Sequence, residues 1–371
     1  MRKLASFGPG IIASLVVSLI MLAACGDDSG NLNADASGLI GTKPTVVVGA
    51  LPGNTTQESS LTTVQPNTPI ATVTPIIAPT PTQEAVSTLT VTIAPTVQPT
   101  FPTRPTPAPY PVTLPTPISF KGKGTVFDRK FHSPILDRDM PYRIYLPPNY
   151  VASGKRYPVL YMLHGLSGSY TEWIDYKLFD FADDLINKGT IKPLVIVLPS
   201  GDQEYWVDHA NDGPQYGLYV ANDVVGFIDA NYRTLAKRES RAIGGHSMGG
   251  HGSLQIAFNH PGVFGVAGAH SPTLRTKDQS PEYFGDEAFF ETHDPVSLAK
   301  VLPNLNNLKI WVDIGTMDKT WRPRAEELHE TLTSRGVVHE WYLFEGDHAG
   351  EYWMAHVPDY LKFYTSSMVV S

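Results

Sequence analysis

The stretch that decides the fold is Ala242-Ile243-Gly244-Gly245-His246-Ser247-Met248-Gly249-Gly250. A short apolar run enters it, turns through glycines and continues as a helix-compatible run. Gly245-x-Ser247-x-Gly249 fits a nucleophile elbow, a strained strand-to-helix turn in which the glycines let the backbone pass without a Cβ clash. About one chain of this length in ten carries the pattern by chance. Other residues must therefore support it.

Two polar loops supply that support. Asp318 follows the predicted strand Ile310–Ile314, and His348 follows the predicted strand His339–Phe344. With Ser247 they fall in the order Ser, Asp, His, as an α/β-hydrolase requires. The chemistry needs all three, because serine is a weak nucleophile, an imidazole must take its proton, and a carboxylate must fix the imidazole tautomer. We therefore predict a catalytic triad of these three residues.

Other residues compete for two of these roles. The alternatives are Asp313 as the acid and His356 or His270 as the base. Asp318 and His348 are favoured because they lie on loops after strands, where such sheets bind their ligands. His246 lies inside the elbow but points elsewhere, so we interpret it as a packing or hydrogen-bonding residue.

A second glycine-containing loop predicts the oxyanion hole. His164-Gly165-Leu166-Ser167-Gly168 follows the predicted strand Val159–Leu163. Its glycines let the loop fold back over the elbow, so that one backbone N–H reaches the oxyanion. We predict that this donor is Leu166 and that the second is Met248, the residue after the nucleophile.

Strand and helix patterns alternate from about Phe120 to Tyr364. The other predicted strands are Thr125–Phe131, Tyr142–Leu146, Leu194–Leu198, Arg241–Gly244 and Val263–Ala267. The predicted helices are Phe179–Asn187, Tyr219–Tyr232, Met248–Asn259, Pro323–Ser334 and Tyr352–Tyr364. This alternation predicts an α/β fold, a mainly parallel sheet with helices on both faces, after an N-terminal hairpin.

The N-terminus predicts export and a lipid anchor. Arg2 and Lys3 precede an apolar run that ends Leu22-Ala23-Ala24-Cys25. This layout is that of a signal peptide over residues 1–24, and the ending resembles the bacterial lipobox, in which the cysteine is lipidated. The alternative is an ordinary signal or anchor with an incidental cysteine. We expect a membrane lipid anchor at Cys25 and an extracytoplasmic catalytic domain without disulfides.

Residues 25–118 are rich in Thr and Pro and almost uncharged, which predicts a disordered linker. The catalytic α/β domain is then expected over residues 119–371. The net charge of −8 argues against nucleic-acid binding, which needs a basic face. Asp208–Gly213 departs from a calcium loop at Ala210, so we interpret it as a turn and predict no metal.

From about Phe127 to Phe363 the chain resembles the esterase D-type esterases, which include S-formylglutathione hydrolases, feruloyl and acetylxylan esterases and mycolyltransferases. The motifs that carry the resemblance are Tyr142–Pro148, Leu160–Gly165 with the following Trp173, Tyr232-Arg233-Thr234, Arg241–Gly250, His260-Pro261 with Phe264, and Gly346-Asp347-His348 with Tyr352-Trp353. The resemblance implies an α/β-hydrolase fold and acyl-ester chemistry without metal or cofactor. It maps the nucleophile to Ser247, the acid to Asp318, the base to His348, and the oxyanion donors to Leu166 and Met248.

The substrate is less closely defined. Asp202, Tyr205 and Trp206 follow a predicted strand, which places them beside the expected cleft. The aromatic rings of Tyr205, Trp206 and Trp173 are candidates to line a cleft suited to sugar or aryl groups. The alternative is an aromatic loop packed on the domain. Arg275–Phe290 is a candidate for a small cap. We expect a membrane-anchored serine esterase acting on small-molecule or carbohydrate esters. An acyltransferase with a sugar or lipid acceptor is the alternative, and an inactive binding lipoprotein is a third hypothesis.

Overall fold

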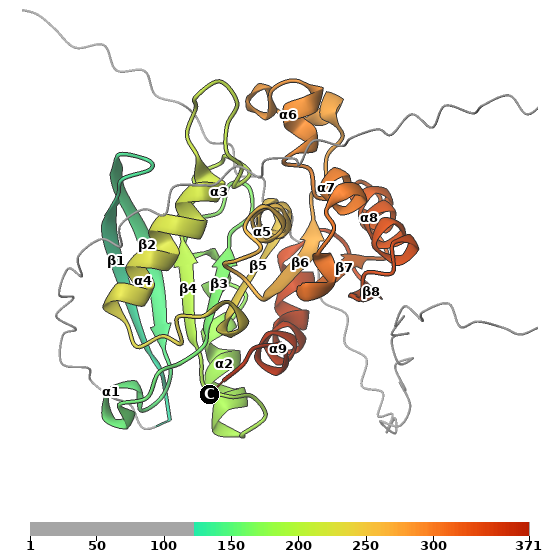
Figure 1. Cartoon of the computed structure of the whole chain (residues 1–371). Helices are drawn as coiled ribbons and strands as arrows, with labels where there is room; N and C mark the ends of the chain where they lie inside the picture. The colour runs from blue at the N-terminus through green and yellow to red at the C-terminus, as the bar shows by residue number, and fades with distance from the viewer. Residues whose placement is uncertain (1–121, 371) are drawn as a thin grey trace, which may run out of the picture. The chain divides into compact units, whose positions relative to one another are not determined.

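The structure, a computed structural model, describes residues 122–370; the predicted signal peptide, Cys25 and the Thr/Pro-rich linker lie outside them. Within this range eight strands form one sheet in the order β1-β2-β4-β3-β5-β6-β7-β8 (Figure 1). β1 pairs antiparallel with β2, as does β2 with β4, and the other pairs are parallel. The strands are β1 Thr125–Ser133, β2 Arg138–Leu146, β3 Val159–Leu163, β4 Val195–Pro199, β5 Arg241–Ser247, β6 Val266–Pro272, β7 Lys309–Gly315 and β8 Glu340–Phe344.

Helices cover both faces of the sheet (Figure 1). They are α1 Tyr150–Ser153, α2 Leu178–Asn187, α3 Tyr216–Leu218, α4 Val225–Asn231, α5 Met248–Asn259, α6 Glu287–Glu291, α7 Pro295–Val301, α8 Arg322–Ser334 and α9 Gly350–Ser367. α4, α5, α7 and α8 pack on one face, and α2 and α9 pack on the other. None of the helices among residues 122–370 combines the length and apolar character that a membrane span requires.

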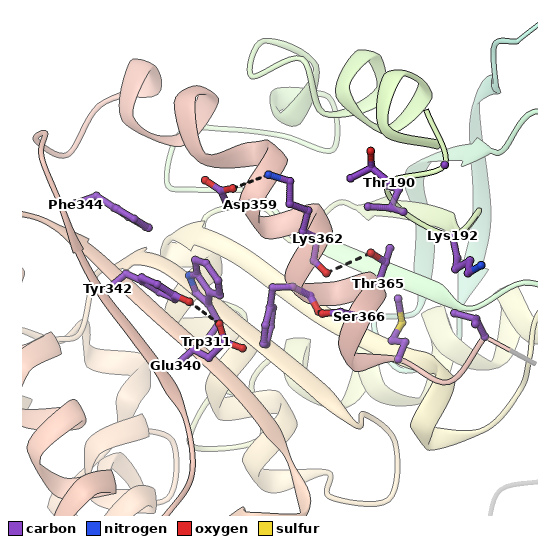
Figure 2. A pocket seen from close by; sticks show the side chains of 15 residues that line it. Thr190, Lys192, Trp311, Glu340, Tyr342, Phe344, Asp359, Lys362, Thr365 and Ser366 are labelled. Atoms are coloured by element: carbon purple, nitrogen blue, oxygen red, sulfur yellow. Dashed lines mark hydrogen bonds and ion pairs between the residues drawn. The ribbon is translucent and has the colours of Figure 1, made fainter. Parts of the chain in front are cut away.

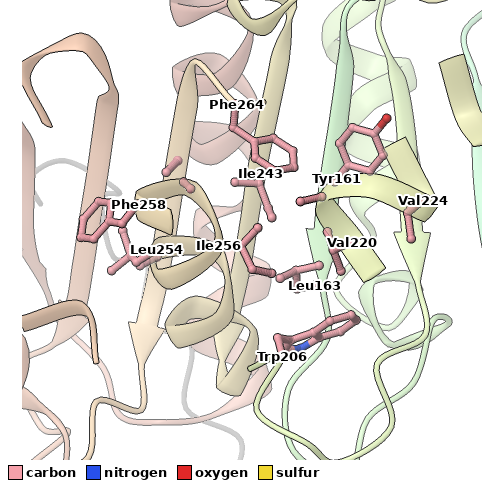
Figure 3. Packing of buried hydrophobic residues seen from close by; sticks show 14 of the residues in the cluster. Tyr161, Leu163, Trp206, Val220, Val224, Ile243, Leu254, Ile256, Phe258 and Phe264 are labelled. Atoms are coloured by element: carbon pink, nitrogen blue, oxygen red, sulfur yellow. The ribbon is translucent and has the colours of Figure 1, made fainter. Parts of the chain in front are cut away.

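The sheet separates two apolar cores because side chains of a strand alternate between its faces. In β3, Tyr161 and Leu163 join the core beneath α5, whereas Leu160 and Met162 join the core beneath α2 and α9. Figure 3 shows the first of these cores, where α5 packs against the strands. Nearly every residue of α5 is buried, so this helix has little amphipathic pattern. The expected α/β-hydrolase fold is confirmed.

Several element boundaries differ from the prediction. β6 begins at Val266 rather than Val263, because Val263 belongs to a turn in which its N–H donates to the His260 carbonyl. The predicted helix Tyr219–Tyr232 begins as a π-helical segment and becomes α-helical only at α4. Helix α7 was not predicted, although Asp294 caps its N-terminus and Pro295 occupies its first turn, both ordinary start signals.

Two glycines on neighbouring strands make room for a tyrosine of α9. A Cβ atom at Gly244 would lie 1.8 Å from the hydroxyl oxygen of Tyr364, and one at Gly268 would lie 2.0 Å from it. That hydroxyl lies 2.8 Å from Nε2 of His270, in the middle of the sheet. The glycines therefore allow a buried polar contact between the sheet and α9.

We predict that Gly244→Ala lowers the free energy of unfolding by about 1–3 kcal/mol, because the methyl group displaces the Tyr364 hydroxyl from His270. Gly226→Ala is the matched control. Apart from the chain neighbours and the backbone of α4 itself, no atom of residues 122–370 lies within 4 Å of a Cβ at Gly226, so this variant should be as stable as the wild type or up to about 1 kcal/mol more stable. Urea unfolding followed by circular dichroism measures both. Equal stability of Gly244→Ala and the wild type would contradict the packing argument.

Candidate active site

Ser247 is held at a sharp turn between β5 and α5. Its φ of 53° and ψ of −119° lie outside the regions that a serine ordinarily adopts. A Cβ at Gly245 would lie 2.5 Å from the backbone of Gly249, and one at Gly249 would lie 2.4 Å from the carbonyl oxygen of Leu163. Both flanking glycines are thus required by close backbone contact. The N-terminus of α5 consequently abuts the end of β3.

The structure brings Ser247, Asp318 and His348 together. Nε2 of His348 lies 2.9 Å from Oγ of Ser247, and Nδ1 of His348 lies 2.8 Å from Oδ2 of Asp318. Asp318 comes from the loop after β7, and His348 from the loop between β8 and α9. With Nδ1–H donating to the carboxylate, Nε2 is left to accept the serine proton. This is the geometry of a general base beside a nucleophile.

Asp318 is buried but accepts three hydrogen bonds. Besides the His348 imidazole, Oδ2 accepts from the Ser271 hydroxyl at 2.9 Å, and Oδ1 accepts from the Trp321 backbone N–H at 3.1 Å. Burial by itself raises the pKa of the Asp318 carboxyl, but these hydrogen bonds outweigh it, led by that of His348, and the pKa lies below its ordinary value. The carboxylate therefore stays ionised beside the imidazole at neutral pH.

Ser271 is a site residue that the sequence analysis missed. Its hydroxyl also lies 3.1 Å from Nδ1 of His348, so it contacts both partners of the His–Asp pair. It lies near the end of β6 with φ at 47°, where the register between β5 and β6 shifts. The predicted strand ended at Ala267, four residues too early to place Ser271 at the sheet edge.

The alternative acid, Asp313, and the alternative bases, His270 and His356, make contacts away from Ser247. Asp313 pairs with His270 at 2.8 Å, and both side chains are wholly buried. The remaining ring nitrogen of His270 contacts Tyr364, so neither nitrogen is available to a serine. His356 stacks on Phe344, with ring centroids 4.1 Å apart.

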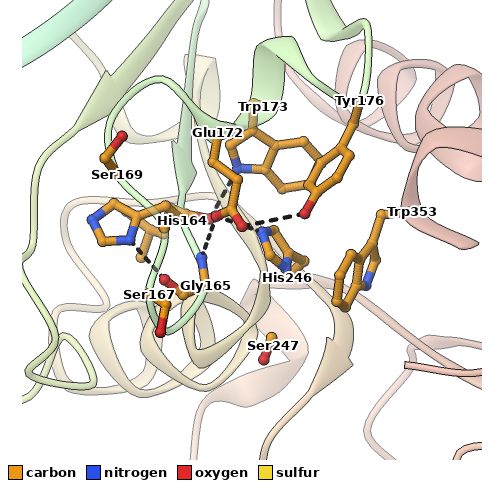
Figure 4. Close-up of polar contacts among 12 residues, drawn as sticks. His164, Gly165, Ser167, Ser169, Glu172, Trp173, Tyr176, His246, Ser247 and Trp353 are labelled. Carbon is orange, nitrogen blue, oxygen red and sulfur yellow. Dashed lines mark hydrogen bonds and ion pairs between the residues drawn. The ribbon is translucent and has the colours of Figure 1, made fainter. Parts of the chain in front are cut away.

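Glu172 connects the loop after β3 to the elbow (Figure 4). Its Oε2 accepts the Gly165 N–H at 2.8 Å and lies 2.9 Å from Nε2 of His246. Burial raises the pKa of Glu172, but the contacts with His246 and Gly165 outweigh burial and lower it overall. His246 also packs against Trp353, with ring centroids 4.2 Å apart. His246 thus has the packing and hydrogen-bonding position expected from the sequence.

His164 fixes the same loop from the other side. Its Nε2 accepts the Gly201 N–H at 3.1 Å, so its proton is on Nδ1, which donates to the Gly165 carbonyl at 2.9 Å. Burial lowers the pKa of His164, which keeps the ring neutral. Both backbone groups of Gly165 are therefore fixed. The next residue, Leu166, is 49% exposed. Met248, the other predicted donor, begins α5 and is buried.

The three aromatic residues predicted to line a substrate cleft are instead buried, and this expectation is corrected. Trp173 is 1% exposed, Tyr205 3% and Trp206 0%. The Trp173 indole donates to the Leu163 carbonyl at 2.9 Å, and the Trp206 indole donates to the His164 carbonyl at 3.1 Å. The two indoles thus hold the end of β3 and the first residue of the loop that follows it. The Asp208–Gly213 segment forms a turn, as interpreted from the sequence.

A groove of about 890 Å³ lies away from these residues (Figure 2). It is lined by Trp311 of β7, by β8, by the second half of α9 with the residues that follow it, and by residues 189–192. Ser247, Asp318 and His348 do not line it, so it is not the candidate active site. Among residues 122–370, no group of three or more His, Cys, Asp or Glu side chains is arranged to hold a metal ion.

The sheet, the elbow and the Ser–His–Asp geometry define a chain of the α/β-hydrolase class. The family model described as "Putative esterase" matches residues 133–364, and the chain belongs to this family. Esterase Rv1288 of Mycobacterium tuberculosis is 33% identical over 146 residues, which cover 38% of this chain and 31% of that protein. An endo-1,4-beta-xylanase/feruloyl esterase of Xylanibacter ruminicola is 31% identical over 153 residues, 39% of this chain and 21% of that protein.

The matched part of this chain thus spans less than a third of the length of these two relatives. Among solved structures, a ferulic acid esterase has a TM-score of 0.61 and 24% identity, with 66% of this chain and 99% of that chain covered. At 24% sequence identity, this structural similarity supports the fold alone.

We predict that Glu172→Ala lowers kcat for an activated ester such as 4-nitrophenyl acetate by about 10–100-fold, because the loop that carries Leu166 loses its anchor. Glu172→Gln should lose less, since its amide oxygen still accepts the Gly165 N–H. Glu330→Gln, on an exposed position of α8, is the control and should leave kcat unchanged. If Glu172→Ala keeps the wild-type kcat, the loop does not depend on this carboxylate.

Proposed function

We propose that this protein is a serine carboxylesterase with Ser247 as nucleophile, His348 as general base and Asp318 as the residue that orients the base. The observation that carries the proposal is the line of hydrogen bonds from the Ser247 hydroxyl through His348 to Asp318, at 2.9 and 2.8 Å. Membership of the esterase family supports the same reaction. Acyl-ester chemistry by this constellation needs no metal or cofactor.

In the first half of the reaction, Oγ of Ser247 attacks the ester carbonyl carbon while Nε2 of His348 takes the hydroxyl proton. The carbonyl oxygen becomes an oxyanion, which the N–H groups of Leu166 and Met248 stabilise. Met248 is the first residue of α5, so its N–H also carries the positive end of that helix. The C–O bond to the alcohol then breaks, and His348 returns the proton to the leaving oxygen.

The acyl group is now bound to Ser247 as an ester. Water enters, His348 takes one of its protons, and the resulting hydroxide attacks the acyl carbon through a second oxyanion. Collapse of this intermediate releases the carboxylic acid and returns the proton to Oγ of Ser247. If an acceptor hydroxyl of a sugar or lipid replaces water, the same residues transfer the acyl group. Product analysis with and without candidate acceptor alcohols separates the two outcomes.

The relatives support a narrower substrate class. One of them is named as both a xylanase and a feruloyl esterase. We therefore propose acyl esters of carbohydrates as the natural substrates. A panel of acetylated and feruloylated oligosaccharides, compared with short-chain alkyl esters, tests this choice.

The proposed location is the outer face of a cell membrane, with the lipid on Cys25. The support is the signal-like sequence of residues 1–24 and the lipobox-like ending before Cys25. The Thr/Pro-rich residues 25–118 then lie between the lipid and the esterase domain.

Ser247→Ala should lower turnover of 4-nitrophenyl butyrate by about 10³-fold or more, because no other group forms the acyl-enzyme. The variant should also lose labelling by a fluorophosphonate probe. Ser334→Ala, an exposed serine of α8, is the control and should keep both properties. Equal rates for Ser247→Ala and the wild type would overturn the mechanism.

Cys25→Ala should move the exported protein from the membrane fraction to the soluble fraction and abolish incorporation of labelled fatty acid. Cys25 is the one cysteine of the chain, so no other thiol can take the lipid. The purified variant should keep wild-type esterase activity. A variant that remains in the membrane fraction would show that the lipobox interpretation is wrong.

A further inference from the structure

Arg275 follows the segment of chain that is bound directly to the nucleophile. The backbone N–H of Thr273 donates to the carbonyl oxygen of Ser247 at 3.1 Å, and Arg275 is two residues further along the chain. The last residues of β6, through Ser271, also contact the His348–Asp318 pair. The position of Arg275 is therefore set by the same backbone that positions the site.

The guanidinium of Arg275 lies one aromatic ring away from the proposed base. Its Cζ is 5.0 Å from the ring centroid of Trp321, and the Trp321 ring is 6.4 Å from the His348 ring, centroid to centroid. The Trp321 backbone in turn donates to Asp318. A substrate whose ester carbonyl reacts at Ser247 would therefore reach Arg275 with a group only a few bonds long that passes the Trp321 ring.

Arg275 is fixed in place without a charged partner. Its Nε donates to the Tyr205 hydroxyl at 2.8 Å, and its Nη1 donates to the Gln279 carbonyl at 3.1 Å. A guanidinium has five N–H donors, so three remain. Within residues 122–370 no carboxylate forms an ion pair with it. Five other arginines there do have carboxylate partners, namely Arg138, Arg143, Arg241, Arg322 and Arg324.

Tyr205 acts as the support for this arrangement. Its ring is buried, its hydroxyl also contacts the Thr273 hydroxyl at 3.2 Å, and Cζ of Arg275 lies 5.1 Å from its ring centroid. Arg275 itself remains partly exposed. A planar cation that is held by neutral groups and partly open to solvent is preorganised for a carboxylate, which accepts two parallel hydrogen bonds from the guanidinium fork.

We propose that Arg275 is a specificity-determining residue that binds a carboxylate of the substrate, so that esters carrying a negative charge are preferred. This inference rests on the proposed esterase function. The carboxylate belongs either to the acyl group or to the alcohol of the ester. In both cases the substrate carries one anionic group besides the ester itself. The competing explanation is that Arg275 only holds Tyr205 and the turn at residues 276–279 in place.

Two matched substrate pairs test the proposal. For the acyl side, the monoester of glutaric acid with 4-nitrophenol is compared with 4-nitrophenyl pentanoate. For the alcohol side, 4-acetoxybenzoate is compared with phenyl acetate. Each pair differs in a carboxylate. The variants are Arg275→Gln and Arg275→Lys. Arg129→Gln is the control, because Arg129 also lies over a ring, that of Phe127, but on β1 at the edge of the sheet.

In at least one pair, Arg275→Gln should lower kcat/KM for the charged ester by about 10–100-fold, mostly through KM, since hydrogen bonds to charged groups have this magnitude. The neutral ester should change less than about 3-fold. Arg275→Lys should keep part of the preference, and high salt should weaken the preference of the wild type. The pair that responds identifies the side that carries the carboxylate.

An equal fall for charged and neutral esters would show that Arg275 is only structural and would overturn the proposal. No change for any ester would overturn it as well. If the wild type hydrolyses neither member of either pair, the proposed esterase function fails instead, so the two failures are distinguishable.

Discussion

The backbone of Ser247 is the constraint on which the rest of the site depends. A serine at φ 53° and ψ −119° costs about 1–3 kcal/mol, and such a conformation persists only where the surroundings leave no alternative. Three contacts exclude the alternatives. Gly245 meets Gly249 too closely for any Cβ, Gly249 meets the Leu163 carbonyl in the same way, and the Thr273 N–H holds the Ser247 carbonyl. The turn therefore also fixes β3 and β6 relative to Ser247.

Three histidines near the elbow pair with carboxylates, and only their second nitrogens distinguish them. Nε2 of His270 is taken by Tyr364, while Nδ1 faces Asp313. His246 presents Nε2 to Glu172, and its Nδ1 is buried without a partner. His270 and His348 both face a carboxylate with Nδ1 and a hydroxyl with Nε2, but that hydroxyl belongs to the buried Tyr364 for His270 and to Ser247 for His348. Because a base needs a nitrogen beside the nucleophile, the partner of Nε2 separates one candidate base from two structural pairs.

The parts of the fold that depend on local sequence pattern could be predicted from the sequence. β3 and α5 have the predicted bounds, because an apolar run and an elbow delimit them. Asp318 and His348 could be favoured because both follow strand ends. Tyr205 could not be placed correctly, since an aromatic residue after a strand is equally suited to a cleft and to packing. Ser271 was missed because its contacts depend on a register shift between two strands, which no residue type signals.

The two halves of the site are built differently. On the side of β3 and β4, Glu172 and His164 fix the backbone groups of Gly165, the residue before the predicted oxyanion donor Leu166, and the Gly201 N–H in turn holds the His164 ring. On the side of β6 and β7, Arg275 has donors without partners among residues 122–370 and remains partly exposed. In the proposed mechanism, rigidity on the first side serves a step common to all esters, the formation of an oxyanion. Unused hydrogen-bonding capacity on the second side is where esters of different structure can be distinguished, so that reaction and selectivity depend on separate groups of residues.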